Sequence, residues 1–440
     1  MCHTFSMSNR DRVILQKAPA DAEALFRTRC VLHCDLNNFF ASVEMLVRPE
    51  LRGKAIAVCG DPEKRSGIVL AKSEPAKKCG VKTGMAIWEA KQLCPEILIV
   101  SKSCSYSKYS RIVRDIYYRY TDKVEAMGGD ECYLDVTESL QLLTKNAKLN
   151  TKNVGEYIAD NIRETIKKEV GLTVSIGVSW NKTYAKLGSD LKKPDATTVI
   201  SRDNYKQVVY PLPVNNLLYV GRKTVRLLEK LNVHTIGDLA EFDPKVLAGH
   251  IGINAYRMVE AARGDDRDEV TGYDYTREVK SVGNGTTLPH DLTTLKEIEQ
   301  VVYLLSEEVA FRMRKKGVKG HTVSLSVRNT SLAWSGAQES VACATNASQT
   351  ITATAMRIFK KIWICNANSV KPVMSLRVAV SNLTKDSRIQ LSLLDDMHEN
   401  KNDKLSAVFD DIRFKYGSSS VMFANGIGGE FQLHFDIIDE

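Results

Sequence analysis

Short hydrophobic runs and helical hydrophobic repeats alternate along the first half of the chain. The runs predict strands at residues 31–35, 55–59, 67–71 and 174–178. Hydrophobic side chains spaced three or four residues apart predict helices at 109–120 and 154–166, with further helices at 41–44 and from Asn181 onward. Between the two repeats, a Gly128-Gly129 turn joins residues 124–127 to 130–136 in a predicted hairpin. This mixture is typical of an α+β fold.

The pattern changes near residue 201, where short helical segments are broken by glycines. These segments are residues 220–224, 235–239 and 250–255. A charged stretch at 263–269 predicts a linker, and a second α+β unit follows Lys280. Its predicted elements are a helix at 301–313 and strands at 322–327 and 376–380. Residues 1–27 and the segment after Leu394 are polar, so we expect a leader and a tail.

Composition narrows the class of protein. A chain of 440 residues is too long for one ordinary core, and the net charge of +8 is compatible with nucleic acid without requiring it. The ten cysteines form no Cys-x-x-Cys pair, which favours free buried thiols in a reducing cytoplasm. The chain offers neither an apolar signal core near its first residues nor a run of about 20 apolar residues. We therefore expect a cytoplasmic protein with no membrane segment.

Three carboxylates stand out near the predicted strand ends. Asp35 ends the first strand, while Asp130 and Glu131 follow the diglycine. Successive residues of a strand face opposite sides of the sheet. Asp130 and Glu131 can therefore serve one site only if the backbone turns there, and glycine allows such a turn. Such oxygen ligands suit magnesium, and two metal ions stabilise an in-line phosphoryl displacement. The alternative is that Asp130 and Glu131 form a solvated turn and Asp35 caps the end of its strand. This alternative explains either group equally well alone, but it does not explain why both occur together with their particular flanking residues.

Those flanking residues carry a family resemblance. The segment CDLNNFFASVE at 34–44 resembles the first catalytic motif of the Y-family lesion-bypass DNA polymerases, and DECYLDVT at 130–137 resembles the second. GVKTGM at 80–85, SIGVS at 175–179 and residues 181–194 agree in order and spacing. The bacterial DNA polymerase IV branch is the most similar, and the resemblance extends from about residue 28 to about residue 420.

The resemblance implies a multidomain α+β right-hand polymerase with palm, fingers, helix-hairpin-helix thumb and an α+β little finger. The implied divisions are a leader at 1–27, palm and fingers at 28–200 with the fingers at about 39–102, a thumb at 201–267, a linker at 268–278, a little finger at 279–395 and a tail at 396–440. The implied function is template-directed, low-fidelity translesion DNA synthesis in DNA repair. A primer 3′-hydroxyl would attack the α-phosphate of a deoxynucleotide on two Mg²⁺ ions. The implied metal ligands are Asp35, Asp130, Glu131 and the Leu36 carbonyl.

The resemblance also implies a nucleotide pocket. Phe40 stands at the steric-gate position, where a bulky ring excludes the 2′-hydroxyl that distinguishes RNA from DNA. The backbone amides of Asn38 and Phe39, at the start of a helix, are expected to contact phosphates together with Lys193. The family commonly has a tyrosine and an arginine on the triphosphate, and here Glu74 and Lys77 take those positions. Lys72 is close enough in sequence to be a partner for Glu74. Gly128-Gly129 replaces the family's usual serine and aliphatic residue.

Expected partners are primer–template DNA, deoxynucleoside triphosphates and the bacterial sliding clamp, and we expect a monomer. Helices that begin directly after a glycine expose backbone amides that can bind phosphate oxygens. Basic side chains also cluster at the end of the predicted 301–313 helix. The predicted DNA-binding residues are Gly221, Arg222, Lys223, Gly252, Asn254, Arg314 and Lys315. The pentapeptide QLSLL resembles a clamp-binding motif through Gln390, Leu391, Leu393 and Leu394.

Two other functions remain open at this stage. Gly128-Gly129-Asp130-Glu131 resembles the signature loop of a diguanylate-type nucleotide cyclase, but Cys132 replaces the usual aromatic residue and the thumb-like hairpins would be unexplained. A non-catalytic scaffold that binds DNA or the clamp would follow if Glu74 and the diglycine had spoiled the pocket.

Overall fold

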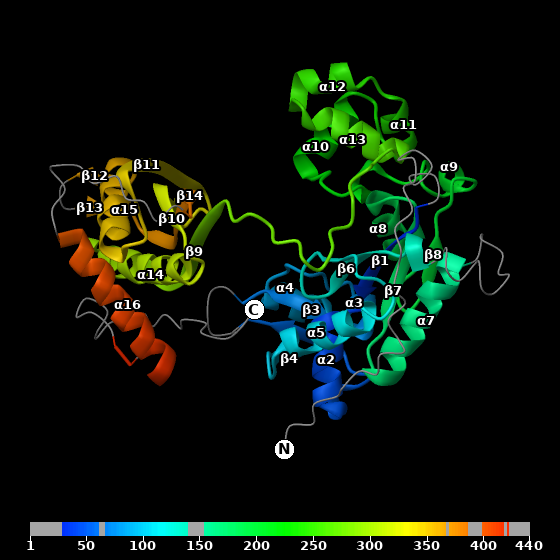
Figure 1. Cartoon of the computed structure of the whole chain (residues 1–440), viewed down its shortest axis with the longest axis horizontal. Coiled ribbons are helices and arrows are strands. Elements are labelled where there is room, and N and C mark those ends of the chain that lie inside the picture. Colours follow the sequence, from blue (N-terminus) through cyan, green and yellow to red (C-terminus); the bar gives the residue numbers. More distant parts are fainter. Residues whose placement is uncertain are drawn as a thin grey trace. The chain divides into compact units, whose positions relative to one another are not determined.

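The computed structural model describes residues 29–60, 67–139, 154–366, 369–385, 398–417 and 420–421. These residues form two compact units (Figure 1). The first is built from residues up to Tyr275 without the segment Gly60–Gly67, and the second begins at Thr276. Both units combine sheets with helices, as the hydrophobic pattern predicted.

A five-stranded sheet forms the centre of the first unit, in the order β5-β6-β1-β7-β8. Its strands are β5 (Val124–Ala126), β6 (Glu131–Asp135), β1 (Val31–Leu36), β7 (Val174–Ser179) and β8 (Thr197–Val199). The pairs are antiparallel except for β7 with β8. Strand and helix predictions in this region are confirmed to within a few residues, including the hairpin of β5 and β6.

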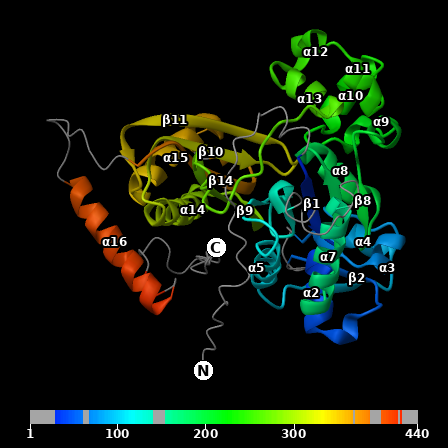
Figure 2. The same cartoon turned by 45° about the vertical axis from the view of Figure 1, so that its right-hand side comes forward.

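The two faces of this sheet have different neighbours because side chains alternate along a strand. Leu32, Cys34 and Leu36 of β1 join a hydrophobic core with the helices α5 (Tyr106–Tyr117) and α7 (Val154–Glu169). The opposite face of β1 carries His33 and Asp35, whose side chains contact α8 (Lys182–Leu191) and the residues directly after it. Figure 2 shows α7 and α8 on this sheet from a second direction.

Close contact between β7 and α8 depends on a glycine. A Cβ atom on Gly177 would lie 1.9 Å from the carbonyl oxygen of Ala185 and 2.5 Å from the amide nitrogen of Ser189. Only a residue without a side chain allows the helix backbone to approach the strand this closely. This approach fixes α8 against the face that carries Asp35.

A smaller sheet and two short helices follow the first strand along the chain. Its order is β3-β2-β4, with β3 (Val69–Lys72) antiparallel and β4 (Leu98–Ser101) parallel to β2 (Ile56–Cys59). The helices are α3 (Glu74–Lys78) and α4 (Ile87–Leu93). α2 (Phe39–Val47) leads from β1 towards this sheet and contacts both β2 and β3. The sheet therefore lies close to the end of β1.

The last part of the first unit is a cluster of short helices with its own hydrophobic core. The helices are α9 (Tyr205–Val208), α10 (Arg222–Lys230), α11 (Ile236–Glu241), α12 (Pro244–Ile251) and α13 (Asn254–Arg263). Thr235 and Asp238 form a capping box at the start of α11. Trp180 and Asn181 both donate hydrogen bonds to the Gly264 carbonyl, so the end of α13 is tied to the start of α8.

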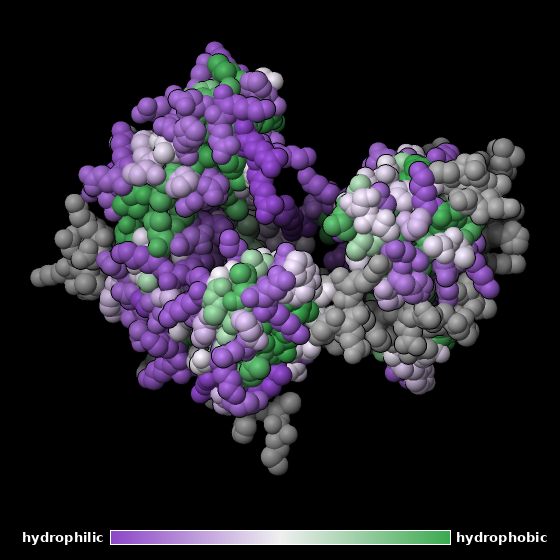
Figure 3. Space-filling model, turned by 180° about the vertical axis from the view of Figure 1, so that it is seen from behind, coloured by the Kyte–Doolittle hydropathy of each residue, from purple (hydrophilic) through white to green (hydrophobic). Residues whose placement is uncertain are grey.

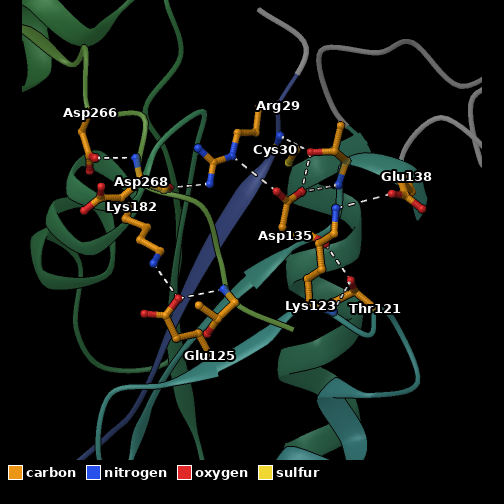
Figure 4. Close-up of polar contacts among 12 residues, drawn as sticks. Arg29, Cys30, Thr121, Lys123, Glu125, Asp135, Glu138, Lys182, Asp266 and Asp268 are labelled. Carbon is orange, nitrogen blue, oxygen red and sulfur yellow. Dashed lines mark hydrogen bonds and ion pairs between the residues drawn. The ribbon is translucent and has the colours of Figure 1, made fainter. Parts of the chain in front are cut away.

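Part of the predicted linker, residues 268–278, is bound to the large sheet (Figure 4). Arg29 donates to the Asp135 carboxylate at 3.3 Å and to the Asp268 carbonyl at 2.7 Å. The Glu125 carboxylate accepts from the ammonium of Lys182 at 2.5 Å and from the Thr271 amide at 2.9 Å. The chain after α13 is thereby held against β5, β6 and α8 as far as residue 271.

The second unit contains a four-stranded antiparallel sheet in the order β11-β10-β14-β9. The strands are β9 (Ser281–Leu292), β10 (Lys319–Arg328), β11 (Trp334–Thr345) and β14 (Val373–Thr384), and β12 (Ile364–Asn366) pairs separately with β13 (Ser369–Val370). Helices α14 (Leu295–Lys315) and α15 (Ser348–Ile362) pack on the sheet around a second core. The hydrophobic pattern predicted α14, β10 and β14 but not β9, β11 or α15.

The predicted polar tail contains a helix, α16 (His398–Tyr416). Arg413 of this helix forms a buried ion pair with Glu307 of α14 at 3.0 Å. Arg314 of α14 forms two hydrogen bonds with the Asp410 carboxylate, at 2.5 and 2.8 Å. α16 therefore belongs to the second unit, which the low hydrophobicity of its sequence did not indicate.

Among the described residues, no helix has the length and hydrophobicity needed to cross a membrane. The face of the first unit visible in Figure 3 is largely hydrophilic, with hydrophobic residues in separate patches. Eight cysteines whose side chains the structure describes form no disulfide, as predicted, and most of them are buried, although Cys79 is exposed.

Candidate active site

A pocket lies where β1 passes into α2. Its lining residues are Asp35, Leu36, Asn38, Phe39, Phe40, Leu70, Ala71, Lys72, Thr83 and Asp130. They come from the end of β1, the start of α2, β3 and the two segments around residues 83 and 130. Three of the four predicted metal ligands, Asp35, Leu36 and Asp130, thus line the same pocket as the predicted steric gate.

Asp35 is almost buried, with 8% of its surface exposed, and pairs across the sheet with Glu131. Its carboxylate accepts a hydrogen bond from the ammonium of Lys193 at 2.6 Å, and that ammonium also contacts Asp190 at 2.8 Å. Burial raises the pKa of Asp35, and the positive charge of Lys193 opposes this rise only in part. Lys193, predicted to bind the triphosphate, is therefore within reach of the metal site.

Glu131 lies on the same face and has two partners that the sequence did not single out. Its carboxylate is 2.9 Å from the ammonium of Lys186 and 3.7 Å from Nε2 of His33. Burial would raise the pKa of Glu131, but its contacts with His33 and Lys186 outweigh burial and lower it. His33 is itself fully buried and bonds through Nδ1 to the hydroxyl of Ser189 at 2.8 Å. The two-residue spacing of His33 and Asp35 could have indicated that they share a face.

Asp130 precedes β6 and faces the pocket. Gly128 has a φ of 134°, a backbone conformation that side chains rarely adopt, so the diglycine does allow the turn that the sequence required. Burial and then the negative charges of Asp35 and Glu131 raise the pKa of Asp130. Asp35 and Asp130 line one pocket and Glu131 pairs with Asp35 across the sheet, so the three carboxylates lie close together.

The described part of the chain contains no ready-made group of three metal ligands. Lysine ammonium groups neutralise two of the three carboxylates, Asp35 through Lys193 and Glu131 through Lys186. The donors nevertheless fit a hard divalent cation, since all are carboxylate oxygens and a cation would relieve the repulsion at Asp130.

The predicted steric gate, Phe40, lines the pocket and is held by aromatic neighbours. Its ring is stacked on Tyr106 with centroids 4.3 Å apart, and Phe39 lies 5.6 Å from it. Phe39 is almost completely buried in the core and is also among the residues that line the pocket.

Glu74 and Lys77 interact with each other and are not among the residues that line the pocket. The Glu74 carboxylate is 3.5 Å from the Lys77 ammonium and accepts a hydrogen bond from the side-chain amide of Asn38 at 2.9 Å. Asn38 has a φ of 49°, a left-handed conformation that asparagine tolerates. The ion-pair partner of Glu74 is thus Lys77 rather than Lys72. The ammonium of Lys72 instead contacts the hydroxyl of Thr83 at 3.2 Å.

The predicted DNA-binding residues lie at helix ends. Gly221 caps α10, whose first residues Arg222 and Lys223 are exposed, and Gly252 ends α12 just before Asn254. In the second unit Lys315 is exposed, whereas Arg314 is engaged by Asp410 and the Asn346 carbonyl. The predicted clamp-binding residues, 390–394, lie outside the described residues, as does the leader at 1–27.

Comparison with known proteins agrees with this geometry. A profile of the impB/mucB/samB family matches residues 34–190, and a profile of the C-terminal domain of that family matches residues 279–393. The chain is 44% identical to DNA polymerase IV of Acetivibrio thermocellus over 396 residues, which is 89% of this chain and 96% of the relative. It is 33% identical to DNA polymerase IV 1 of Bacillus subtilis over 400 residues, which is 90% and 92% of the two chains.

The fold agrees as well. A solved Y-family DNA polymerase chimera superimposes with a TM-score of 0.69 at 23% identity, covering 81% of this chain and all of that one. The superposition shows the predicted multidomain α+β fold, and the family profiles and the relatives named DNA polymerase IV place the chain among the Y-family polymerases. Within that class, the chain belongs to the DNA polymerase IV family. It is a DNA-directed DNA polymerase of the translesion type, acting on primer–template DNA and deoxynucleoside triphosphates. Divalent metal dependence is general in this family, and neither the cyclase nor the scaffold is favoured.

Proposed function

We propose that Asp35, Asp130 and Glu131, with the Leu36 carbonyl, hold two Mg²⁺ ions on which a primer 3′-hydroxyl attacks the α-phosphate of a deoxynucleotide. The observation that carries this proposal is geometric: Asp35, Leu36 and Asp130 line one pocket, and Glu131 lies directly opposite Asp35 in the sheet. The two ions would stabilise the charges on the attacking and leaving oxygens. The chain's own residues position the reactants and exclude water.

Lys193 has a double role in this proposal. Burial lowers its pKa, but the negative charges of Asp35 and Asp190 outweigh burial and raise it, so the ammonium stays charged. Asp35 would hold a cation that neutralises its carboxylate in place of Lys193. The Lys193 side chain would then be available to bind the triphosphate, together with the amides of Asn38 and Phe39.

The test is primer extension with purified full-length protein, a primer–template and all four deoxynucleotides over a range of Mg²⁺ concentrations. Asp130→Asn is expected to abolish extension while leaving primer–template binding intact. Asp115→Asn is the matched control, because Asp115 is exposed on α5 and is not among the residues that line the pocket. Extension by Asp130→Asn at the rate of the control would refute the assignment.

Domain roles follow from the same family. We assign the palm to residues 28–38 and 103–200, the fingers to 39–102, the thumb to 201–267 and the little finger to 279–395. The helix ends at Gly221 and Gly252, with Arg222, Lys223 and Asn254, are proposed to bind the DNA backbone without reading its sequence. Substituting Lys223 by alanine is expected to weaken binding equally for unrelated sequences and to reduce its salt dependence.

We also propose that Gln390, Leu391, Leu393 and Leu394 bind the bacterial sliding clamp. Tethering would raise the effective concentration of the polymerase at the primer end. Loaded clamp should therefore stimulate extension by the full chain, and a Gln390→Ala, Leu393→Ala double variant should lose that stimulation but keep its clamp-independent rate. We propose a monomer in the cytoplasm, where the free thiols of this chain would persist. Light scattering of the purified chain checks the monomer.

A further inference from the structure

The pocket contains a cation that the family resemblance did not assign. Lys72, at the end of β3, lines the pocket together with Thr83, Asp35 and Asp130. Lys77, which stands where the family has its triphosphate arginine, is not among the lining residues. The same is true of Glu74, so neither of the two family positions lines this pocket.

Contacts around Glu74 explain this arrangement. The Glu74 carboxylate bonds to the side-chain amide of Asn38 and lies 3.5 Å from the Lys77 ammonium. A hydrogen bond from Asn38, with a smaller contribution from Lys77, lowers the pKa of Glu74, so it is ionised at neutral pH. Glu74 and Lys77 therefore neutralise each other, and Lys77 offers little net charge to a phosphate.

Lys72 has no such compensation. Its ammonium contacts the neutral hydroxyl of Thr83 at 3.2 Å, and among the described residues no carboxylate forms an ion pair with it. Burial and then the positive charge of Lys77 lower the pKa of Lys72, and Glu74 opposes this only in part. Lys193 adds a further repulsion. An anion in the pocket would relieve these effects.

We propose that Lys72 and Thr83, rather than Glu74 and Lys77, bind the triphosphate of the incoming nucleotide. The ammonium of Lys72 donates to a phosphate oxygen, and the hydroxyl of Thr83, which can rotate, donates beside it. Glu74 serves to hold Asn38 at the start of α2. This inference rests on the proposed active centre, because the metal carboxylates Asp35 and Asp130 place the phosphates in this pocket.

The experiment compares three lysine variants of the full chain, Lys72→Met, Lys77→Met and Lys78→Met, in single-nucleotide primer extension. Lys78 is the matched control, since it is exposed on α3 outside the pocket. Loss of one hydrogen bond between charged groups is expected to raise the KM for the nucleotide of Lys72→Met about tenfold or more, with kcat nearly unchanged. Lys77→Met should show a smaller rise.

A binding readout separates phosphate recognition from a structural role. Inorganic pyrophosphate, used as a competitive inhibitor, should lose affinity for Lys72→Met by a factor similar to that for the nucleotide. Thr83→Val keeps the shape but removes the hydroxyl, and should raise the KM about two- to tenfold. Lys72→Arg retains the charge and should recover most of the affinity, which covers the possibility that the methionine variant is poorly folded.

The outcomes are distinct. A KM of Lys72→Met that exceeds that of Lys78→Met by about tenfold, with a smaller rise for Lys77→Met, supports the proposal, and a rise for Lys77→Met as large as that for Lys72→Met overturns it. A KM within about twofold of that control overturns it. Wild-type protein is assayed alongside Asp130→Asn. If the proposed metal site is wrong, Asp130→Asn will extend the primer; if only the role of Lys72 is wrong, the KM of Lys72→Met will be unchanged.

Discussion

The ring of Phe40 is stacked on the ring of Tyr106, with centroids 4.3 Å apart and an angle of 18° between the planes. The hydroxyl of Tyr106 in turn donates to the buried carboxylate of Glu44 at 2.6 Å. Phe40 faces the pocket, so this stack fixes the position of the residue that is proposed to exclude ribonucleotides. Sugar selection is thus expected to depend on a helix, α5, that lies more than sixty residues further along the chain.

Removing the stack should relax sugar selection. Phe40→Ala is expected to raise the incorporation of ribonucleotides relative to deoxynucleotides about tenfold or more, because space for the 2′-hydroxyl opens. Tyr106→Ala should produce a smaller rise, since Phe40 stays in place but can move. Tyr106→Phe keeps the stacked ring and is the matched control. Comparing kcat/KM for a ribonucleotide and the corresponding deoxynucleotide measures this, and equal selectivity of Tyr106→Ala and Tyr106→Phe would contradict it.

Glu74 is expected to act through Asn38. Glu74→Gln retains an oxygen that accepts from the Asn38 amide, whereas Glu74→Ala does not. The alanine variant should therefore lower kcat/KM about two- to tenfold, the range expected for one hydrogen bond, and the glutamine variant much less. Steady-state extension with a single nucleotide measures both. If Glu74 instead repelled the triphosphate, both variants would bind nucleotide more tightly than wild type.

The pH dependence of stability should report the carboxylate of Glu44. Burial alone would raise its pKa, but hydrogen bonds from Ser103 and Tyr106 outweigh burial and keep the pKa below its ordinary value of 4.5. A carboxyl group with a lowered pKa in the folded state stabilises the protein above its unfolded pKa, and that contribution is lost as pH falls through the folded pKa. Glu44→Gln should lower the melting temperature at pH 7. The gap to wild type should narrow below about pH 4.5.

Gly177 allows α8 to pack directly on β7. A Cβ atom there would clash with backbone atoms of Ala185 and Ser189, which cannot move aside as a side chain could. Gly177→Ala is expected to reduce the free energy of unfolding by about 3 kcal/mol or more, at or above the range for overpacked cores. Gly249→Ala is the control, because it has open space around it within α12 and should be neutral or slightly stabilising. Denaturant unfolding of both variants tests this.

Arg314 and Lys315 are adjacent but should respond differently to substitution. Arg314 donates to Asp410 and to the Asn346 carbonyl, so Arg314→Ala should lower the stability of the second unit. Lys315 is exposed, so Lys315→Ala should leave stability unchanged and weaken DNA binding modestly, mainly at low salt. Thermal unfolding and DNA titrations of the two variants separate these effects. A larger loss of DNA affinity for Arg314→Ala, with unchanged stability, would reverse the assignment.

The elements around the pocket were predictable because their signals are local. β1 is a hydrophobic run, the hairpin of β5 and β6 is marked by the diglycine between its strands, and α7 has hydrophobic residues at helical spacing. By contrast, α16 has little hydrophobic pattern and is held by ion pairs with α14, such as Arg413 with Glu307, whose partners are far apart in sequence. Long-range charge pairing leaves no periodic trace along the chain, so no pattern of spacing could have indicated this helix.

The sequence by itself singled out the residues that are proposed to carry the chemistry. Asp35, Asp130, Glu131 and Phe40 lie in short motifs whose spacing is set by strands and turns, and a strand or turn is a local structure. Only the tertiary structure decided their neighbours: Lys193 on Asp35, Lys186 on Glu131 and Tyr106 under Phe40. It also decided that Lys72, rather than Lys77, lines the pocket. Contacts of this kind depend on how separate elements pack in space, and packing is fixed by the whole fold rather than by any one segment.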